Sequence, residues 1–115
     1  MAKVTDPKKL SLVVDLTGID LGDKAKDTAV ERIVANVIEN IMHTYSQLKR
    51  GLTEPERKQF YRVQNALEKA VKEEAKEVEL ANEDFGFIRK CKREALLTPN
   101  ELLQRVEELI DACAV

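Results

Sequence analysis

The chain has 115 residues and a net charge of −2, with 43% hydrophobic and 35% charged side chains. This length suits one domain, and the composition supports a small core under a charged surface rather than a disordered chain. Only 4% of the residues are aromatic, so the core must be mainly aliphatic. The near-neutral balance excludes a global field that would draw the protein to nucleic acid or anionic lipid. Residues 1–115 are therefore predicted to form a single domain, with a flexible start over residues 1–9.

A tetrad of threonine and glutamate occurs three times along the chain. Its members are Thr28 and Glu31, Thr53 and Glu56, and Thr98 and Glu101. At this spacing the threonine hydroxyl and the glutamate carboxylate can cap backbone N–H groups of a first helical turn. Each tetrad opens a stretch with helical apolar spacing, which predicts helices within residues 28–113. The predicted class is mostly α, with four helices and a short N-terminal β-strand or hairpin.

The N-terminal segment, residues 10–23, carries a β signal. Leu10–Leu16 is short and rich in β-branched residues, which predicts a strand. Gly18 and Gly22 predict a turn, and Ile19–Leu21 is compatible with a second short strand. One hairpin is not stable alone in water, so we expect it to pack on the helices or on another subunit.

Three aspartates gather around this turn, namely Asp15, Asp20 and Asp23. Glycine-containing acidic loops can bind Ca²⁺ or Mg²⁺, but the spacing differs from that of an EF-hand. A polar turn is the favoured interpretation, and ion binding by this loop stays open. Two cysteines and one histidine are too few for a usual zinc site, and no nucleophile stands at a recognisable spacing from a base. The sequence predicts no catalytic residue, no metal site and no cofactor.

The first predicted helix, from about Ala29 to Leu48, has an almost unbroken apolar stripe. The stripe is wide for so small a chain, so we expect part of it to face a partner. Four side chains form the candidate interface: Ile33, Val37, Ile41 and Tyr45. A homo-oligomer is favoured, since a second copy could cover the stripe.

The remaining elements follow from apolar spacing and helix caps. A second helix is predicted from about Glu54 to Ala75, ahead of a short extended link at Glu77–Leu80. The third helix is expected to start at Asn82 or Ala81, and Asn82 is the better cap by its chemistry. The fourth helix is expected to begin at Pro99, after a Thr98 cap.

The N-terminus shows no signal-peptide pattern, and no apolar run is long enough to cross a membrane. Cys91 and Cys113 fall on predicted apolar helix faces, which favours buried, reduced thiols. A cytoplasmic protein without membrane association is therefore predicted.

The densest basic cluster contains Arg89, Lys90, Lys92 and Arg93. Cations grouped around one helical turn can bind phosphates. The helix that follows is acidic and would repel DNA, so nucleic acid is not the favoured partner. A small regulator that binds nucleic acid, or the host transcription or defence machinery, is the alternative function for this cluster.

Several short motifs resemble small phage and prophage proteins of unassigned role. They are a short Asp-containing strand, Ala35-Asn36, Glu56–Tyr61, Val78–Leu80, and Ile88–Lys90 after Asp84. The similarity covers about residues 10–95, whereas Leu96–Asn100 departs from the Gly-Lys-Ala and Pro-Leu-Val segments of such proteins. The resemblance implies a phage origin and the cytoplasm of an infected host, and it implies no functional residue.

The favoured function is a non-enzymatic protein-interaction or assembly factor. It is expected to be phage-encoded and chaperone-like, and to act through helix faces as a homo-oligomer.

Overall fold

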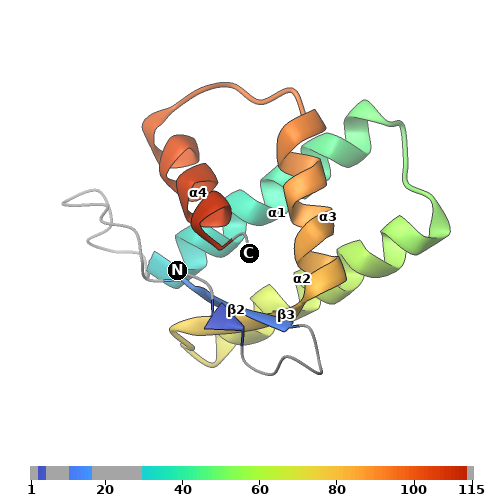
Figure 1. Ribbon diagram of the computed structural model, residues 1–115. Coiled ribbons are helices and arrows are strands. Elements are labelled where there is room, and N and C mark those ends of the chain that lie inside the picture. Colours follow the sequence, from blue (N-terminus) through green and yellow to red (C-terminus); the bar gives the residue numbers. More distant parts are fainter. Residues whose placement is uncertain (1–2, 5–10, 17–29, 114–115) are drawn as a thin grey trace.

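Four helices dominate the part of the chain that the computed structural model describes, residues 3–4, 11–16 and 30–113 (Figure 1). They are α1 (Val30–Leu48), α2 (Glu54–Lys72), α3 (Asn82–Glu94) and α4 (Glu101–Ala112). The α1 and α2 helices form a hairpin, α3 packs on both of them, and α4 packs on α1 and α3. The mostly helical class predicted from apolar spacing is thus confirmed.

A small antiparallel sheet lies at one end of the helices, against α2 and α3 (Figure 1). Its strands, in spatial order, are β1 (Lys3–Val4), β2 (Ser11–Asp15) and β3 (Glu77–Ala81). Val14 of β2 pairs with Val78 of β3, and both side chains are buried. Burial alternates along β3, as the period of two in a strand requires.

The β2 strand lies inside the segment predicted as a strand, and β3 replaces the predicted extended link. Its pairing with β2 joins residues more than sixty positions apart, such as Ser11 and Ala81. The predicted second strand at Ile19–Leu21 lies outside the described residues. The same holds for Asp20 and Asp23 of the acidic loop.

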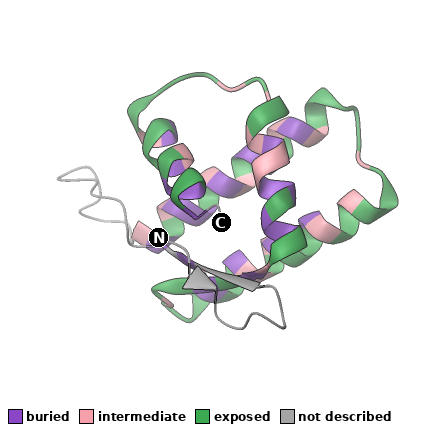
Figure 2. Cartoon of the chain, viewed as in Figure 1, coloured by how far each residue is buried: buried purple, intermediate pink, exposed green. Residues whose placement is uncertain are grey.

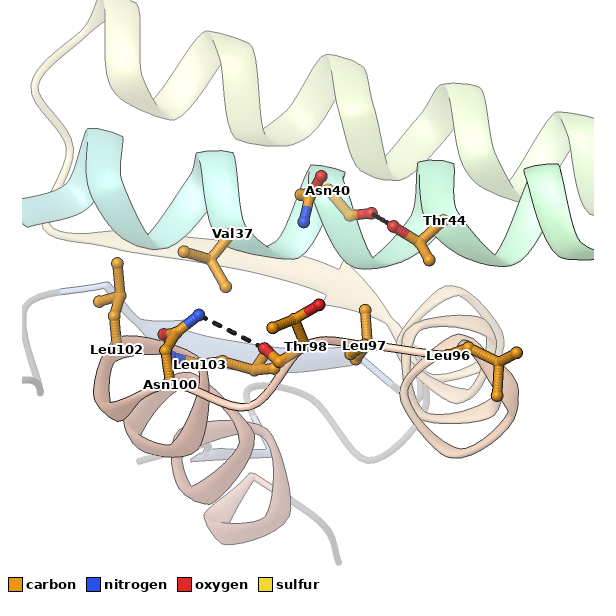
Figure 3. A pocket seen from close by; sticks show the side chains of 9 residues that line it. All are labelled: Val37, Asn40, Thr44, Leu96, Leu97, Thr98, Asn100, Leu102 and Leu103. Atoms are coloured by element: carbon orange, nitrogen blue, oxygen red, sulfur yellow. Dashed lines mark hydrogen bonds between the residues drawn. The ribbon is translucent and has the colours of Figure 1, made fainter.

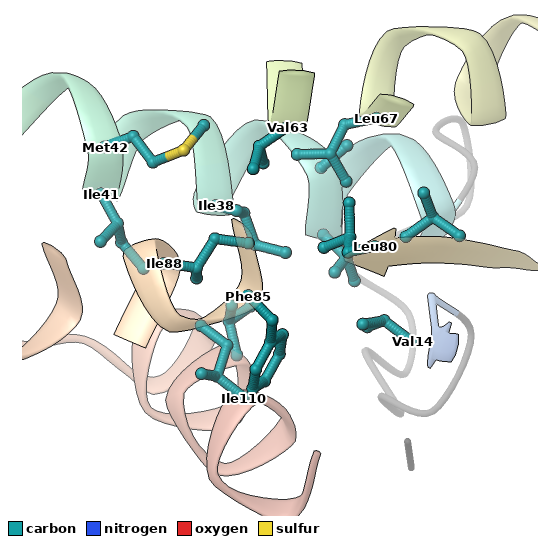
Figure 4. Packing of buried hydrophobic residues seen from close by; sticks show 14 of the residues in the cluster. Val14, Ile38, Ile41, Met42, Val63, Leu67, Leu80, Phe85, Ile88 and Ile110 are labelled. Carbon is teal, nitrogen blue, oxygen red and sulfur yellow. The ribbon is translucent and has the colours of Figure 1, made fainter. Parts of the chain in front are cut away.

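The aliphatic core fills the space between α1, α2, α3, α4 and the sheet (Figures 2 and 4). Its members include Val14, Ile38, Ile41, Met42, Val63, Leu67, Leu80, Phe85, Ile88 and Ile110. Burial follows the inner faces of the helices in Figure 2. Removing this apolar surface from water contributes roughly 25 cal/mol per Å², which offsets the modest helix propensity of the β-branched residues in α1.

The α2 helix ends at Lys72, three residues before the predicted Ala75. Glu74 adopts a left-handed φ of 55°, and the Ala75 N–H turns back to donate to the carbonyl of Ala70 at 2.8 Å. This closure satisfies a carbonyl of the last turn. At the end of α1, Gly51 takes a φ of 120°, and its N–H donates to the Ser46 carbonyl at 2.9 Å, which closes the helix.

The predicted start of α4 is wrong. The helix begins after Asn100, whose side-chain oxygen accepts from the Leu103 N–H at 2.8 Å. Asparagine is at least as good an N-cap as threonine, and here it takes that role from Thr98. Pro99 therefore precedes the helix instead of opening it.

Of the two residues predicted for the start of α3, the structure places Ala81 and not the preferred Asn82 at the cap. Ala81 occupies the N-cap position with extended backbone angles, and Asn82 is the first helical residue. Ala81 is at the same time the last residue of β3, where it pairs with Ser11. The strand therefore passes directly into the helix, and strand pairing fixes the boundary in place of a side-chain cap.

Candidate functional site

A pocket of about 270 Å³ lies between α1 and the start of α4 (Figure 3). Its lining comes from α1, from the connection that follows α3, and from the first turn of α4. The lining residues are Val37, Asn40, Thr44, Leu96, Leu97, Thr98, Asn100, Leu102 and Leu103. We call this the α1–α4 pocket.

None of these nine side chains is charged, and five of them are aliphatic. The polar ones are partly occupied by nearby backbone groups. The Thr44 hydroxyl donates to the Asn40 carbonyl at 2.8 Å, and Asn100 caps α4 through the Leu103 N–H. A neutral hollow of this kind offers no group for acid–base chemistry and suits an apolar side chain of a partner.

Leu96 stands at the rim of the α1–α4 pocket, two residues after α3 ends. It is 77% exposed, more than any other large apolar side chain of the described residues. An exposed aliphatic side chain beside a pocket is typical of interaction surfaces. Sequence reasoning missed it, although two successive leucines after a helix end were a usable signal.

The structure divides the four predicted interface residues of α1 into two pairs. Ile41 and Tyr45 are 0% and 2% exposed, so they belong to the core. Ile33 and Val37 are half-buried, and Val37 lines the α1–α4 pocket. Packing within the chain covers the centre of the apolar stripe and leaves only its edge, with Ile33 and Val37, accessible to a partner. The candidate interface is therefore reduced to these two residues.

Two side chains of the predicted basic cluster form ion pairs with acids on other helices. The cluster comprises Arg89, Lys90, Lys92 and Arg93. The ammonium group of Lys90 lies 3.1 Å from Glu56, and that of Lys92 lies 2.8 Å from Asp111 in α4. One of the two arginines is half-buried and the other is exposed. Two of the four cations are thus engaged within the chain, and nucleic-acid binding through this cluster stays a prediction.

Glu56 is the centre of a polar network that joins α1, α2 and α3. Its Oε2 accepts from the Tyr45 hydroxyl at 2.9 Å and from the Lys90 ammonium at 3.1 Å. Its Oε1 accepts from the Thr53 N–H at 3.3 Å and from the Thr53 hydroxyl at 2.9 Å, so the predicted capping box at α2 is confirmed. Burial raises the pKa of Glu56, but the hydrogen bonds from Lys90, Thr53 and Tyr45 outweigh it and lower the pKa to about 2.

Asp84 forms a second polar connection between α2 and α3. Its side chain is only 6% exposed, yet it faces the guanidinium of Arg62. The Nη2 of Arg62 donates to Oδ1 at 2.7 Å and Nε donates to Oδ2 at 3.0 Å, which is the paired geometry that arginine offers a carboxylate. Both acids therefore connect helices, and neither lines the α1–α4 pocket.

Both cysteines are buried, as predicted. Burial raises the pKa of the Cys91 thiol to about 12, so the reactive thiolate is not formed near neutral pH. Within residues 3–4, 11–16 and 30–113, no group of three or more His, Cys, Asp or Glu side chains is placed to hold a metal ion.

No protein-family model matches the chain, and comparisons with curated proteins and with solved structures gave no match. Over the described residues, none of the helices is both long enough and apolar enough to span a membrane. The function is therefore argued from the pocket and its surroundings.

Proposed function

We propose that the protein is a non-enzymatic interaction factor that self-associates through the α1–α4 pocket and the adjacent Leu96. The observation that carries this proposal is an uncharged pocket of about 270 Å³ beside a leucine that is 77% exposed. Exposure of a leucine to water is unfavourable, and the aliphatic part of the uncharged lining offers a surface against which such a side chain can be buried. The exposed Leu96 of one copy could therefore be buried in the α1–α4 pocket of another.

A two-fold dimer would satisfy both features at once. In such an interface the same patch meets itself, so Leu96 of each copy can enter the pocket of the other. Charges close to a two-fold axis face charges of the same sign, which opposes association. The neutral lining of the α1–α4 pocket avoids that repulsion, which favours a second copy over a charged partner.

Self-association of this kind suits an assembly or chaperone-like role. The uncharged, partly aliphatic lining of the α1–α4 pocket is compatible with that role. The alternative regulator would act through Arg89, Lys90, Lys92 and Arg93. It is the weaker proposal, because Lys90 and Lys92 would have to leave their ion pairs to bind phosphate.

Light scattering during gel filtration, at several loading concentrations, tests the proposal. We expect a mass of about two chains of 13.0 kDa. Leu96→Asp should give monomers, since burial of one leucine contributes about 1.5–3 kcal/mol and a two-fold dimer contains two. The dissociation constant should rise by at least about a hundredfold.

Leu48→Asp is the matched control, because Leu48 is also an exposed leucine, at 42%, but does not line the pocket. It should leave the mass unchanged. A monomer at every concentration of the unmodified protein would overturn the proposal. So would equal effects of the two leucine substitutions.

A further inference from the structure

A second pocket, of about 250 Å³, lies at the turn between α1 and α2. It shares no lining residue with the α1–α4 pocket. Its lining consists of His43, Ser46, Gly51, Leu52, Arg57, Phe60 and Tyr61. We call it the corner pocket, and the self-association proposed above does not use it.

Aromatic rings form one wall of the corner pocket. The rings of His43 and Phe60 lie edge to face, with centroids 4.9 Å apart, and Phe60 and Tyr61 follow at 6.2 Å. Phe60 is only 7% exposed and anchors this wall in the core, whereas Tyr61 is 55% exposed. Exposed tyrosines supply large contact areas for little loss of side-chain entropy and are enriched where partners bind.

Arg57 gives the corner pocket its electrostatic character. Its Nη1 donates to the Leu52 carbonyl at 2.8 Å, which holds the guanidinium at the pocket and leaves its other N–H groups for a ligand. No carboxylate belongs to the lining. Glu54 and Glu56, the acids of the same helical turn, each form an ion pair with a lysine. Within the described part of the chain, Arg57 makes no ion pair with a carboxylate.

The backbone around the corner pocket is held in place before any ligand arrives. The Gly51 N–H donates to the Ser46 carbonyl at 2.9 Å, and Gly51 takes a φ of 120° that other residues rarely adopt. A wall fixed in this way does not have to be ordered on binding, which lowers the entropic cost of association.

We infer that the corner pocket binds a peptide segment in which an apolar side chain, best an aromatic one, stands next to a carboxylate. The apolar side chain would pack against Phe60 and Tyr61. The carboxylate would accept hydrogen bonds from the remaining N–H groups of Arg57, which match carboxylate geometry. The acid Glu39 lies one turn of α1 before His43 but lines a different groove, so it does not occupy the Arg57 side of the pocket.

Titration of two short peptides, followed through backbone amide resonances, tests this inference. The acidic probe is acetyl-Glu-Phe-Glu-amide, and the matched control is acetyl-Lys-Phe-Lys-amide. The acidic probe should shift the amide resonances of Gly51 and Leu52 in a saturable way at millimolar concentrations. The basic control should not, because the ring contact alone lacks the ion pair with Arg57. Added salt should weaken the binding of the acidic probe, because Arg57 is exposed and salt screens its charge.

Variants separate recognition from general surface effects. Arg57→Gln should weaken the acidic probe about tenfold, as expected for loss of a charge-assisted hydrogen bond. Lys58→Gln removes a neighbouring exposed cation that does not line the pocket, and affinity should stay within about twofold. Tyr61→Ala should also weaken binding and, as an exposed position, should fold normally.

Three outcomes would overturn the inference. They are no shift at Gly51 and Leu52 with the acidic probe, an equal response to the lysine probe, and unchanged affinity in both Arg57→Gln and Tyr61→Ala. The readout is independent of oligomeric state, so it stands or falls separately from self-association through the α1–α4 pocket.

Discussion

The contact between α2 and α3 and the contacts of α4 with α1 and α3 are built in different ways. At the first, the buried Asp84 pairs with Arg62 through bonds as short as 2.7 Å. At the contacts of α4, the α1–α4 pocket separates part of α4 from α1, and the ion pair of Asp111 with Lys92 of α3 leaves Asp111 59% exposed and Lys92 15% exposed. Two parallel hydrogen bonds from Arg62 to Asp84 fix the position of a helix more firmly than the single contact between Lys92 and Asp111 does. We therefore expect the α1–α2–α3 unit to be the rigid part of the domain and α4 to be its more adaptable edge.

This difference explains where a binding surface can form. A pocket requires packing that is incomplete, and incomplete packing is tolerated only where the rest of the domain is stable without it. At α4 the packing is incomplete in this way: the connection over residues 95–100 is irregular, and Leu102 is only half-buried. We expect α4 to open before the other helices do.

The largest expected effect comes from truncation of a buried side chain inside the rigid part. Ile88 of α3 is 1% exposed, so Ile88→Ala should lower the free energy of unfolding by about 3 kcal/mol. Leu102 of α4 is half-buried beside the pocket, and Leu102→Ala should cost about 1 kcal/mol or less, because water already reaches it. Urea titrations measure both. Equal losses would mean that α4 is as firmly packed as α3.

Next in size is the removal of one carboxylate from each of two ion pairs, Arg62–Asp84 between α2 and α3 and Lys92–Asp111 between α3 and α4. Asp84→Ala should cost about 2 kcal/mol, since it removes the hydrogen bonds that a carboxylate only 6% exposed accepts from Arg62. Asp111→Ala should cost less, about 1 kcal/mol, because Asp111 is 59% exposed and makes a single contact with Lys92. Hydrogen exchange sharpens the result. Asp111→Ala should speed exchange in α4 alone, whereas Asp84→Ala should speed it in all four helices.

The rigid part was the more predictable from sequence. The apolar period of α1 fixed its length to within one residue, because a helix repeats every 3.6 residues wherever it packs. Which portion of the stripe stays accessible depends on where α3 and α4 lie. Ile41 and Tyr45 were therefore assigned to an interface although they belong to the core.

The α1–α4 pocket was less predictable, since its lining includes an irregular connection. No period marks Leu96 or Leu97, and their position against α1 follows only from the tertiary packing. The cap of α4 shows the same limit, since Thr98 and Asn100 are both good N-caps and local sequence does not choose between them. The capping box at Glu56 was predictable, but its pairing with Lys90, 34 residues further on, was not.

Acid titration tests the network at Glu56 within the rigid part. The pKa of Glu56 is lowered from its ordinary 4.5 to about 2, so the folded state holds the charged form more tightly than the unfolded state does. This stabilisation is present above pH 4.5 and is lost as the pH falls through about 2. Glu56→Gln should therefore cost about 1–2 kcal/mol at pH 7, and the difference should shrink towards pH 2.

The control for this titration is Glu54→Gln, in the same helical turn. Glu54 is 69% exposed and pairs with Lys58, so its removal should change stability by less than about 0.5 kcal/mol. A Glu56→Gln difference that is the same at pH 7 and at low pH would show that the network does not depend on the charge.

The smallest expected effect concerns the repulsion between Glu39 of α1 and Glu68 of α2. This repulsion lies within the rigid part and reduces the difference in stability between that part and α4. Glu39 of α1 and Glu68 of α2 line one groove, and burial followed by the charge of Glu68 raises the pKa of Glu39. A raised carboxyl pKa means stability that is present at low pH and lost as the pH rises through the folded-state value. Glu39→Gln should thus stabilise the protein at pH 7 by a few tenths of a kcal/mol, roughly. Glu68→Gln should act in the same direction, and the double variant should gain less than the sum, because both remove one repulsion. If Glu39→Gln destabilises the protein instead, the charge of Glu39 is used within the groove, and the α1–α2 contact is as well paired as the one between α2 and α3.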